Sequence, residues 1–166
     1  ALIAERDEEA EDIVAVLHEI IREIRYLRAE LGISPAEYCR VRLNFSDGYT
    51  FERLRSCGRY IEQLAKCRIE EVGLGLPKPD RVAMGRIPGV DVYLLVADLV
   101  DVEKEIERLA KKALHLEEEI QKVKRRVGNQ DFLHRAPQEV VEKEKERLRA
   151  LLIEKERLDI LRAGMQ

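Results

Sequence analysis

The chain has 166 residues, enough for one ordinary domain or for a small domain with an extended arm. Its 30 basic and 33 acidic residues give a formal net charge of −3, so the charge balance alone does not indicate nucleic-acid binding. Charged residues make up 38% of the chain, aromatic residues 5%, and Trp is absent, which is typical of extended helices rather than an aromatic-filled core. Without a run of 18 apolar residues or a signal peptide, we expect a soluble, cytoplasmic protein with no membrane contact.

The first expected element is a helix from Glu5 to Leu31, with apolar residues at helical spacing and an end marked by Gly32 and Pro35. An acidic run at residues 5–12 suits a helix N-terminus and argues against RNA binding there. Because the chain begins at Ala1, without an initiator Met, we expect a piece of a longer protein. Three arginines lie opposite the apolar residues: Arg22, Arg25 and Arg28. We interpret them as a solvated basic face, with an RNA contact or an ion pair to a neighbouring domain as alternatives.

Residues 36–98 show the pattern of strands around one helix. The predicted elements are a strand at Tyr38–Phe45, a helix at Tyr49–Lys66, and strands at Cys67–Leu74, Arg81–Ile87 and Val90–Val96. The dipeptide Pro88-Gly89 joins the last two strands as a hairpin turn. This β-α-β-β order predicts a small mixed sheet with a helix on one face. Since no Gly, Pro or Ser lies between Val92 and Lys104, we expect the sheet and the next helix to form a nearly rigid unit.

From Leu99 the apolar residues recur at alternating steps of three and four, the 3.5-residue period of a coiled coil. Heptad positions a and d, the apolar seam, hold Leu99, Val102, Ile106, Leu109, Ala113, Leu116, Ile120, Val123 and Val127. A second apolar stripe follows at Val141, Leu148, Leu151, Leu152, Leu158 and Leu161. The simplest arrangement is an antiparallel hairpin. We therefore predict an α+β fold: an N-terminal helix (1–35), a small α/β base (36–98) and a long two-helix coiled-coil hairpin (99–166).

The break between the two arm helices has its own pattern. The dipeptide Gly128-Asn129 tolerates left-handed backbone at a helix end, and Pro137 suits the first position of the next helix. Phe132 is an aromatic residue in a charged segment. We expect its ring to fold back over the end of the seam near Val127 and Val140, with stacking on an RNA base as the alternative.

No catalytic or metal-binding pattern emerges from the sequence. The cysteines Cys39, Cys57 and Cys67 lack C-x-x-C spacing, and the histidines His18, His115 and His134 are scattered. Gly73-Leu74-Gly75 is too short for a phosphate-binding loop, and no Ser lies in a nucleophile-elbow context. We expect reduced thiols, no metal, no cofactor and no active site in this chain.

Basic residues concentrate on the side of the first arm helix that points away from its partner. With Leu99 at position a, the outer positions c and f carry Lys104, Arg108, Lys111, His115, Lys122 and Arg125. The tip adds Lys124, Arg126 and Arg135. A phosphate backbone would be attracted to such a surface with a strong salt dependence, although a merely solubilising basic face is the alternative. We expect the outer stripe to supply most of the binding and the tip to contribute at its distal end.

At the break the sequence resembles the C-terminal arm of bacterial-type valyl-tRNA synthetases. Asn129-Gln130-Asp131-Phe132 followed by Ala136-Pro137-Gln138-Glu139-Val140-Val141 is similar to the N-x-x-F…A-P-x-x-V-V-x-x-E signature of that family. Residues 102–109 resemble its first arm helix, and residues 24–30 with Ser34-Pro35 resemble the last helix of its anticodon-binding domain. Tyr38-Cys39, residues 73–80 and Gly128 depart from the family pattern.

The resemblance implies a role without chemistry. In that family the ATP-dependent catalytic core lies upstream, and the arm leans on the outer corner of tRNA, where the D and T loops meet. The implied partners are tRNA, with valine tRNA as the expected species, and the remainder of the synthetase chain. An arm of this kind would recognise shape and backbone rather than base sequence. The alternative from another class is a structural coiled-coil module that docks another protein.

Overall fold

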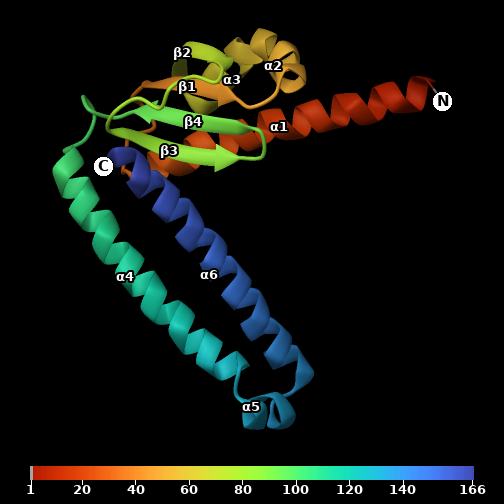
Figure 1. Ribbon diagram of the computed structural model, residues 1–166, viewed down its shortest axis with the longest axis vertical. Coiled ribbons are helices and arrows are strands. Elements are labelled where there is room, and N and C mark those ends of the chain that lie inside the picture. The colour runs from red at the N-terminus through yellow and green to blue at the C-terminus, as the bar shows by residue number, and fades with distance from the viewer. Residues whose placement is uncertain (1) are drawn as a thin grey trace.

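The computed structural model describes the backbone of residues 2–166 and the side chains of residues 8–166; Ala1, where the predicted first domain begins, lies outside the described residues. The elements in order are α1 (Leu2–Glu30), β1 (Cys39–Phe45), α2 (Gly48–Leu54), the 3₁₀ turn η1 (Arg55–Cys57), α3 (Gly58–Ala65), β2 (Cys67–Leu74), β3 (Val82–Ile87), β4 (Val90–Leu95), α4 (Val102–Val127), α5 (Gln130–Arg135) and α6 (Gln138–Met165). The predicted α+β class is confirmed, and a long hairpin extends from a small α/β base (Figure 1).

The sheet has the strand order β2-β1-β4-β3, with β1 and β2 parallel and the other pairs antiparallel. The predicted mixed sheet is therefore confirmed. Gly89 takes a φ of +80° in the turn between β3 and β4, a conformation that favours glycine. The single helix predicted at 49–66 is wrong in detail: it consists of α2 and α3 joined by η1. The interruption comes immediately before Gly58, a poor helix former.

The core lies between α1 and one face of the sheet. Ile20, Ile24 and Leu27 of α1 are fully buried, as are Val41 and Leu43 of β1, which alternate with more exposed neighbours as a half-buried strand requires. Helix α1 ends as predicted at Gly32, which has a φ of +63°. The N–H groups of Gly32 and Ile33 donate to the carbonyls of Ala29 and Arg28, so a Schellman motif closes the helix.

The interpretation of Arg28 as part of a solvated face is wrong. Its side chain is only 6% exposed and donates to four backbone carbonyls, those of Ser34, Glu37, Ala65 and Lys66. Arg28 therefore ties the end of α1 to the end of α3. A planar guanidinium has five N–H donors, so one arginine can serve several carbonyls at once. The three-residue spacing of the arginines in the sequence does not indicate this contact.

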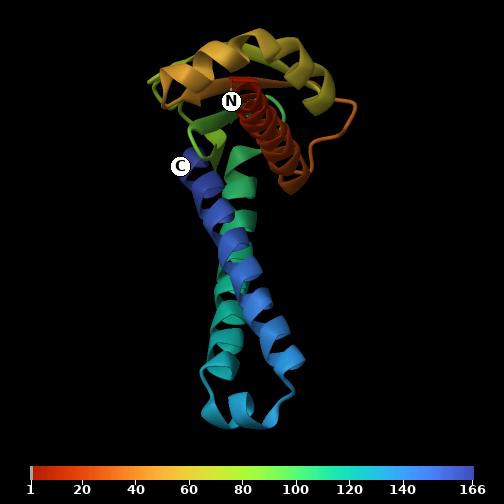
Figure 2. The ribbon, with the colours of Figure 1, turned by 90° about the vertical axis from the view of Figure 1, so that its right-hand side faces the viewer.

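Helices α4 and α6 pack together as the predicted antiparallel hairpin (Figures 1 and 2). The seam residues Val102, Leu109, Ala113, Leu116, Ile120 and Val123 are buried on α4. On α6, Val141, Leu158 and Leu161 are buried, whereas Leu152 is 42% exposed and does not belong to the predicted stripe. Fewer apolar residues of α6 are therefore buried in the seam than the sequence pattern predicts. An exposed leucine is compatible with this helix, since leucine is a good helix former wherever it lies.

The break between the arm helices differs from the prediction. Gly128 is right-handed (φ −82°, ψ −7°), and Asn129 is extended and caps the additional helix α5. The Asn129 Oδ1 atom accepts hydrogen bonds from the backbone N–H groups of Asp131 and Phe132, at 2.9 and 3.3 Å. Asn129 is thus a helix N-cap rather than a left-handed helix end. Pro137 precedes α6 in the capping position instead of occupying its first turn.

Both ends of the arm attach to the base. At the first end, Val96 is fully buried, its carbonyl accepts from the N–H groups of Leu99 and Val100, and Asp101 caps α4. At the second end, Gly164 of α6 lies against β3 so closely that a Cβ atom there would be 2.5 Å from the Val82 carbonyl oxygen. The last turns of α6 therefore cover the edge of the sheet at β3.

Candidate nucleic-acid interface

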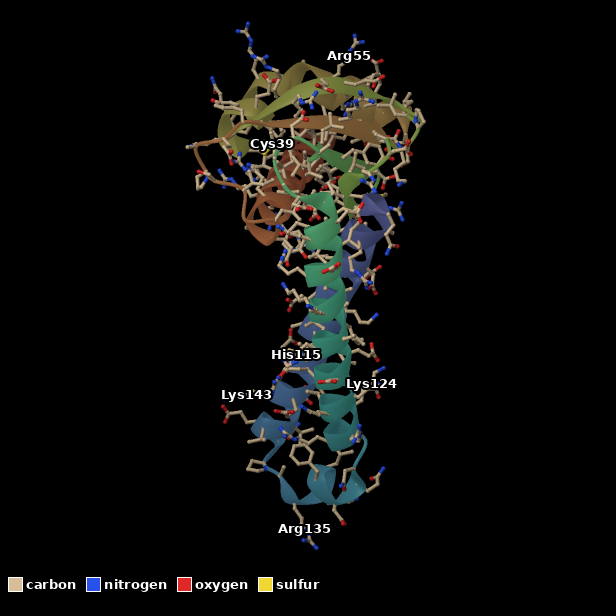
Figure 3. The ribbon with its side chains drawn as sticks, turned by 90° about the vertical axis from the view of Figure 1, so that its left-hand side faces the viewer. Cys39, Arg55, His115, Lys124, Arg135 and Lys143 are labelled. Carbon is tan, nitrogen blue, oxygen red and sulfur yellow. The ribbon has the colours of Figure 1, made fainter. Side chains whose placement is uncertain are left out.

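The arm carries a set of exposed cations that make no ion pair within residues 8–166. These are Lys111, Lys122, Lys124, Arg125 and Arg135. Four of them lie on α4 and one at the end of α5. Figure 3 shows Lys124 on the flank of α4 and Arg135 pointing away from the tip. This set, which we call the free cations, is available for contacts with an external anion.

The other three predicted RNA-binding residues are engaged within the chain. Lys104 lies 3.5 Å from Asp101. Arg108 donates to the carboxylate of Glu105 and to the backbone carbonyl of Glu30, at 2.9 and 2.5 Å. Arg108 therefore helps to dock α4 against the end of α1, although its side chain is still 45% exposed. The unengaged part of the predicted stripe is consequently the part from Lys111 toward the tip.

Arg126 and its acidic neighbours occupy the boundary between the two helices. Four pairs cross this boundary: Arg126–Glu144 (3.1 Å), Arg147–Glu119 (3.5 Å), Lys155–Glu117 (3.8 Å) and Lys112–Glu154 (3.5 Å). Such pairs flank the seam of a coiled coil and help to set its partner and orientation. Two of these pairs engage acids of α4 and two engage its cations, so the excess of positive charge on the outward face of that helix comes from the free cations themselves.

Lys112 was not among the predicted site residues, and the structure gives it a second contact. Its Nζ atom lies 2.8 Å from a Glu30 carboxylate oxygen as well as 3.5 Å from Glu154. Lys112 thus joins α1, α4 and α6. In the heptad numbering Lys112 falls at position g, beside the seam. Charged residues at this position commonly pair with the partner helix, so the sequence pattern could have predicted the contact with α6.

At the tip, Phe132 is half-buried and Val140 is 42% exposed. Ala136 is half-buried, and Gly128 and Pro137 are exposed. The break residues thus shape a short capped helix that presents Arg135. Packing of the Phe132 ring over the end of the seam stays a prediction, and so does its alternative, stacking on an RNA base.

The described side chains also define what the chain offers chemically. Cys39, Cys57 and Cys67 are free thiols, and burial, with Glu62 adding to it, raises the pKa of Cys67 to about 12. No cluster of three or more His, Cys, Asp or Glu residues suited to a metal ion occurs among residues whose side chains are placed. Nor does any helix in the described part of the chain have the length and apolar character needed to cross a membrane.

Comparison with known proteins decides what kind of arm this is. Residues 101–166, which comprise α4, α5 and α6, match the family described as "Valyl tRNA synthetase tRNA binding arm". The arm belongs to this family. The resemblance inferred from the break motif is thereby confirmed.

Similarity to valine–tRNA ligases extends beyond the arm into the base. The chain is 39% identical over 160 residues to the enzyme of Carboxydothermus hydrogenoformans, 33% over 143 residues to that of Clostridium perfringens and 26% over 141 residues to that of Bacillus subtilis. These alignments cover 95%, 84% and 85% of the chain, respectively. The chain spans only 16–18% of the length of these relatives. The alternative of a protein-docking coiled coil finds no comparable support.

Proposed function

We propose that this chain is a non-catalytic tRNA-binding unit of a valine–tRNA ligase, whose arm meets the outer corner of tRNA. The observation that carries the proposal is the coincidence of two features on one element. The residues that match the tRNA-binding arm family also carry the free cations, in a chain whose overall charge is negative.

The geometry of the arm supports recognition of backbone rather than base. Cations spaced along the outer face of a rod of two paired helices can meet successive phosphates of a curved backbone. A-form RNA has a deep major groove that side chains do not read, so shape and phosphate contacts carry the recognition. The seam and the boundary ion pairs keep the rod stiff enough to hold the cations in register.

The remaining functions of the proposed parent enzyme would reside outside these residues. We infer that the chain needs no cofactor or metal of its own and that ATP acts in the catalytic part of the ligase. The expected RNA is valine tRNA, although an arm that reads backbone shape would contribute little to the choice of amino acid. As a participant in translation, the protein would act in the cytoplasm.

A salt titration of the whole chain with a valine tRNA transcript tests the proposal. We expect a dissociation constant that rises steeply with salt, because bound cations are released from the RNA when lysine and arginine neutralise phosphates. A chain that fails to bind the transcript even at low salt would overturn the proposal and would favour a role in docking another protein.

A further inference from the structure

A second basic surface lies on the base, away from the arm, around an open hollow of about 340 Å³. The hollow is lined by Tyr38, Arg59, Glu62, Gln63, Cys67 and Arg68. These residues come from the segment before β1, from α3 and from the start of β2. The volume falls in the range of small-ligand sites. We call this site the base hollow.

The cations of the base hollow are unengaged, like those of the arm. Arg59 and Arg68 are exposed and form no ion pair within the described side chains. Lys66, next to the hollow, is also exposed and unpaired there, and its left-handed backbone (φ +49°) turns the chain sharply between α3 and β2. Arg59 and Arg68 thus line the hollow itself, and Lys66 adds a third positive charge at the turn between α3 and β2.

The acidic groups nearby make contacts within the chain. A Glu62 carboxylate oxygen accepts a hydrogen bond from the backbone N–H of Ile69 at 2.8 Å, and Glu70 pairs with Arg40 at 3.0 Å. Glu37 accepts from the N–H of Ser34 at 3.3 Å. Cys67 remains a neutral thiol at physiological pH, because burial raises its pKa to about 12. Glu62, which lines the hollow, keeps its negative charge while it holds the Ile69 N–H, and no ion pair joins it to Arg59 or Arg68 among the described side chains, so the two arginines of the hollow outnumber its one carboxylate.

Tyr38 gives the hollow an aromatic surface. Tyr38 is 66% exposed, compared with 52% for Tyr49 and 46% for Tyr60. An exposed aromatic ring beside unpaired arginines is the combination with which proteins hold an unpaired nucleotide, by stacking on the base and pairing with the phosphate. Tyr60 and Tyr49 are also exposed, but neither lines the hollow, so Tyr38 is the ring placed among the cations.

The end of α1 connects the base hollow to the arm. Glu30 binds Arg108 and Lys112 of α4, and two residues earlier Arg28 holds the carbonyls of Ala65 and Lys66 at the end of α3. The basic side of α4 and the basic end of α3 therefore flank the same helix end. The end of α1 is therefore the segment that links the arm to the part of the base that holds the hollow.

We propose that the base hollow is a second RNA contact, in which Tyr38 stacks on an unpaired nucleotide of the RNA held by the arm while Arg59 and Arg68 bind its phosphates. This proposal rests on the proposed function, since the RNA is the one that the arm binds. The proposal adds a binding site on the base. It also implies that the chain prefers an RNA with an unpaired nucleotide outside the region that contacts the arm.

The test compares variants of the whole chain in binding a valine tRNA transcript at several salt concentrations. Tyr38→Ala should weaken binding roughly five- to hundredfold without changing the salt slope, because base stacking does not depend on counter-ions. The double variant Arg59→Gln, Arg68→Gln should reduce the magnitude of the log–log salt slope by about 1.5 units. Matched controls are Tyr60→Ala and Arg55→Gln, which alter an exposed tyrosine and an exposed arginine outside the hollow.

The outcomes separate this proposal from the proposed function. If the hollow variants bind like their controls while Lys122→Gln, Arg125→Gln weakens binding, the base hollow is not an RNA contact and the arm function stands. If the unchanged chain binds no tRNA, both proposals fail. Equal loss in Tyr38→Ala and Tyr60→Ala would also overturn the assignment, because the effect would then not be specific to the hollow.

Discussion

The guanidinium of Arg157 on α6 donates to the Glu23 carboxylate of α1 at 2.7 Å and lies over the ring of Tyr26, 3.6 Å from its centroid. The Glu23 side chain is only 7% exposed and packs against Gly85 of β3, where a Cβ atom would be 2.5 Å from its carboxylate oxygen. This contact joins residues 134 positions apart in the sequence. It fixes α6 against α1, and with it the direction in which the arm leaves the base.

The first prediction is that Arg157→Gln destabilises the protein and does so in a pH-dependent way. Removal of Arg157 leaves a buried carboxylate without its partner, so we expect a loss of about 2 kcal/mol at pH 7, below the 3 to 5 typical of fully buried pairs because Arg157 is partly exposed. Chemical denaturation followed by circular dichroism measures this free energy. Arg149→Gln, which removes an exposed pair with Glu146, should change it by under about 0.5 kcal/mol.

The sign of the pH dependence follows from burial. Burial raises the pKa of Glu23, and Arg157 opposes that shift. A native carboxyl that binds its proton more tightly than the unfolded one lowers stability as pH rises through the interval between the two pKa values. Without Arg157 the native pKa rises further. The loss caused by Arg157→Gln should therefore be smaller near pH 4.5 than at pH 7, and a loss independent of pH would exclude Glu23 as its cause.

The second prediction is that Gly164→Ala weakens the attachment of α6 to the sheet. The added Cβ would lie 2.5 Å from the Val82 carbonyl oxygen and 2.7 Å from the Met84 Cβ, so α6 or β3 must move. We expect thermal unfolding to report a loss of about 1 to 3 kcal/mol, as for other overpacked sites. Gly58→Ala is the matched control. Gly58 has right-handed backbone, and an added Cβ there would lie 3.7 Å from the Ile69 Cδ1, an ordinary contact, so the control should be close to neutral; equal losses would contradict the close-approach argument.

The third prediction concerns Arg28→Lys. A lysine keeps the charge but cannot reach four carbonyls with one ammonium group, so some of the carbonyls of Ser34, Glu37, Ala65 and Lys66 lose their donor. With charge-assisted hydrogen bonds worth about 1.5 to 3 kcal/mol each, we expect a loss of at least about 2 kcal/mol in urea unfolding. Arg22→Lys on the same helix, at an exposed position, should have almost no effect. If both substitutions are harmless, Arg28 does not hold α1 to α3.

The sequence predicted those parts of the fold that depend on local periodicity. The spacing of Leu109, Leu116 and Val123 fixed the face that α4 buries, and the alternation in β1 fixed the face that the strand buries. These predictions succeed because a helix or a strand has one period and one buried side. The hairpin turn at Pro88-Gly89 was also predictable from local sequence, because glycine adopts the positive φ of that turn without strain.

The remainder depends on contacts between distant segments. Arg28 reads as a surface residue in the sequence, since the carbonyls that it binds come from another helix and a loop. Arg108 fits the outer position of a heptad but meets the end of α1 in three dimensions. From the sequence, Asn129 could equally end α4 or begin the next helix. Its side-chain hydrogen bonds show that it caps the start of α5. The base hollow combines three segments and has no signature in any one of them.

The last prediction concerns which face of the arm meets the RNA. The triple variant Lys111→Gln, Lys122→Gln, Arg125→Gln removes free cations from α4 and should reduce the magnitude of the log–log salt slope for tRNA by roughly two to three units. Helicity measured by circular dichroism should hardly change, because Gln is a good helix former. The control triple on α6, Lys143→Gln, Lys145→Gln, Arg149→Gln, removes the same charge from residues that are paired with neighbouring glutamates.

Comparison of the two triples separates a specific face from a general charge effect. If net charge alone attracts RNA, both triples flatten the salt slope equally; if the outer face of α4 is the contact, only the first does. The pair Arg126→Gln, Arg135→Gln tests the tip and should act less than the α4 triple, since Arg126 is engaged with Glu144 and only Arg135 is free. Loss of all binding in the tip pair, with an intact slope in the α4 triple, would move the contact from the side of the arm to its end.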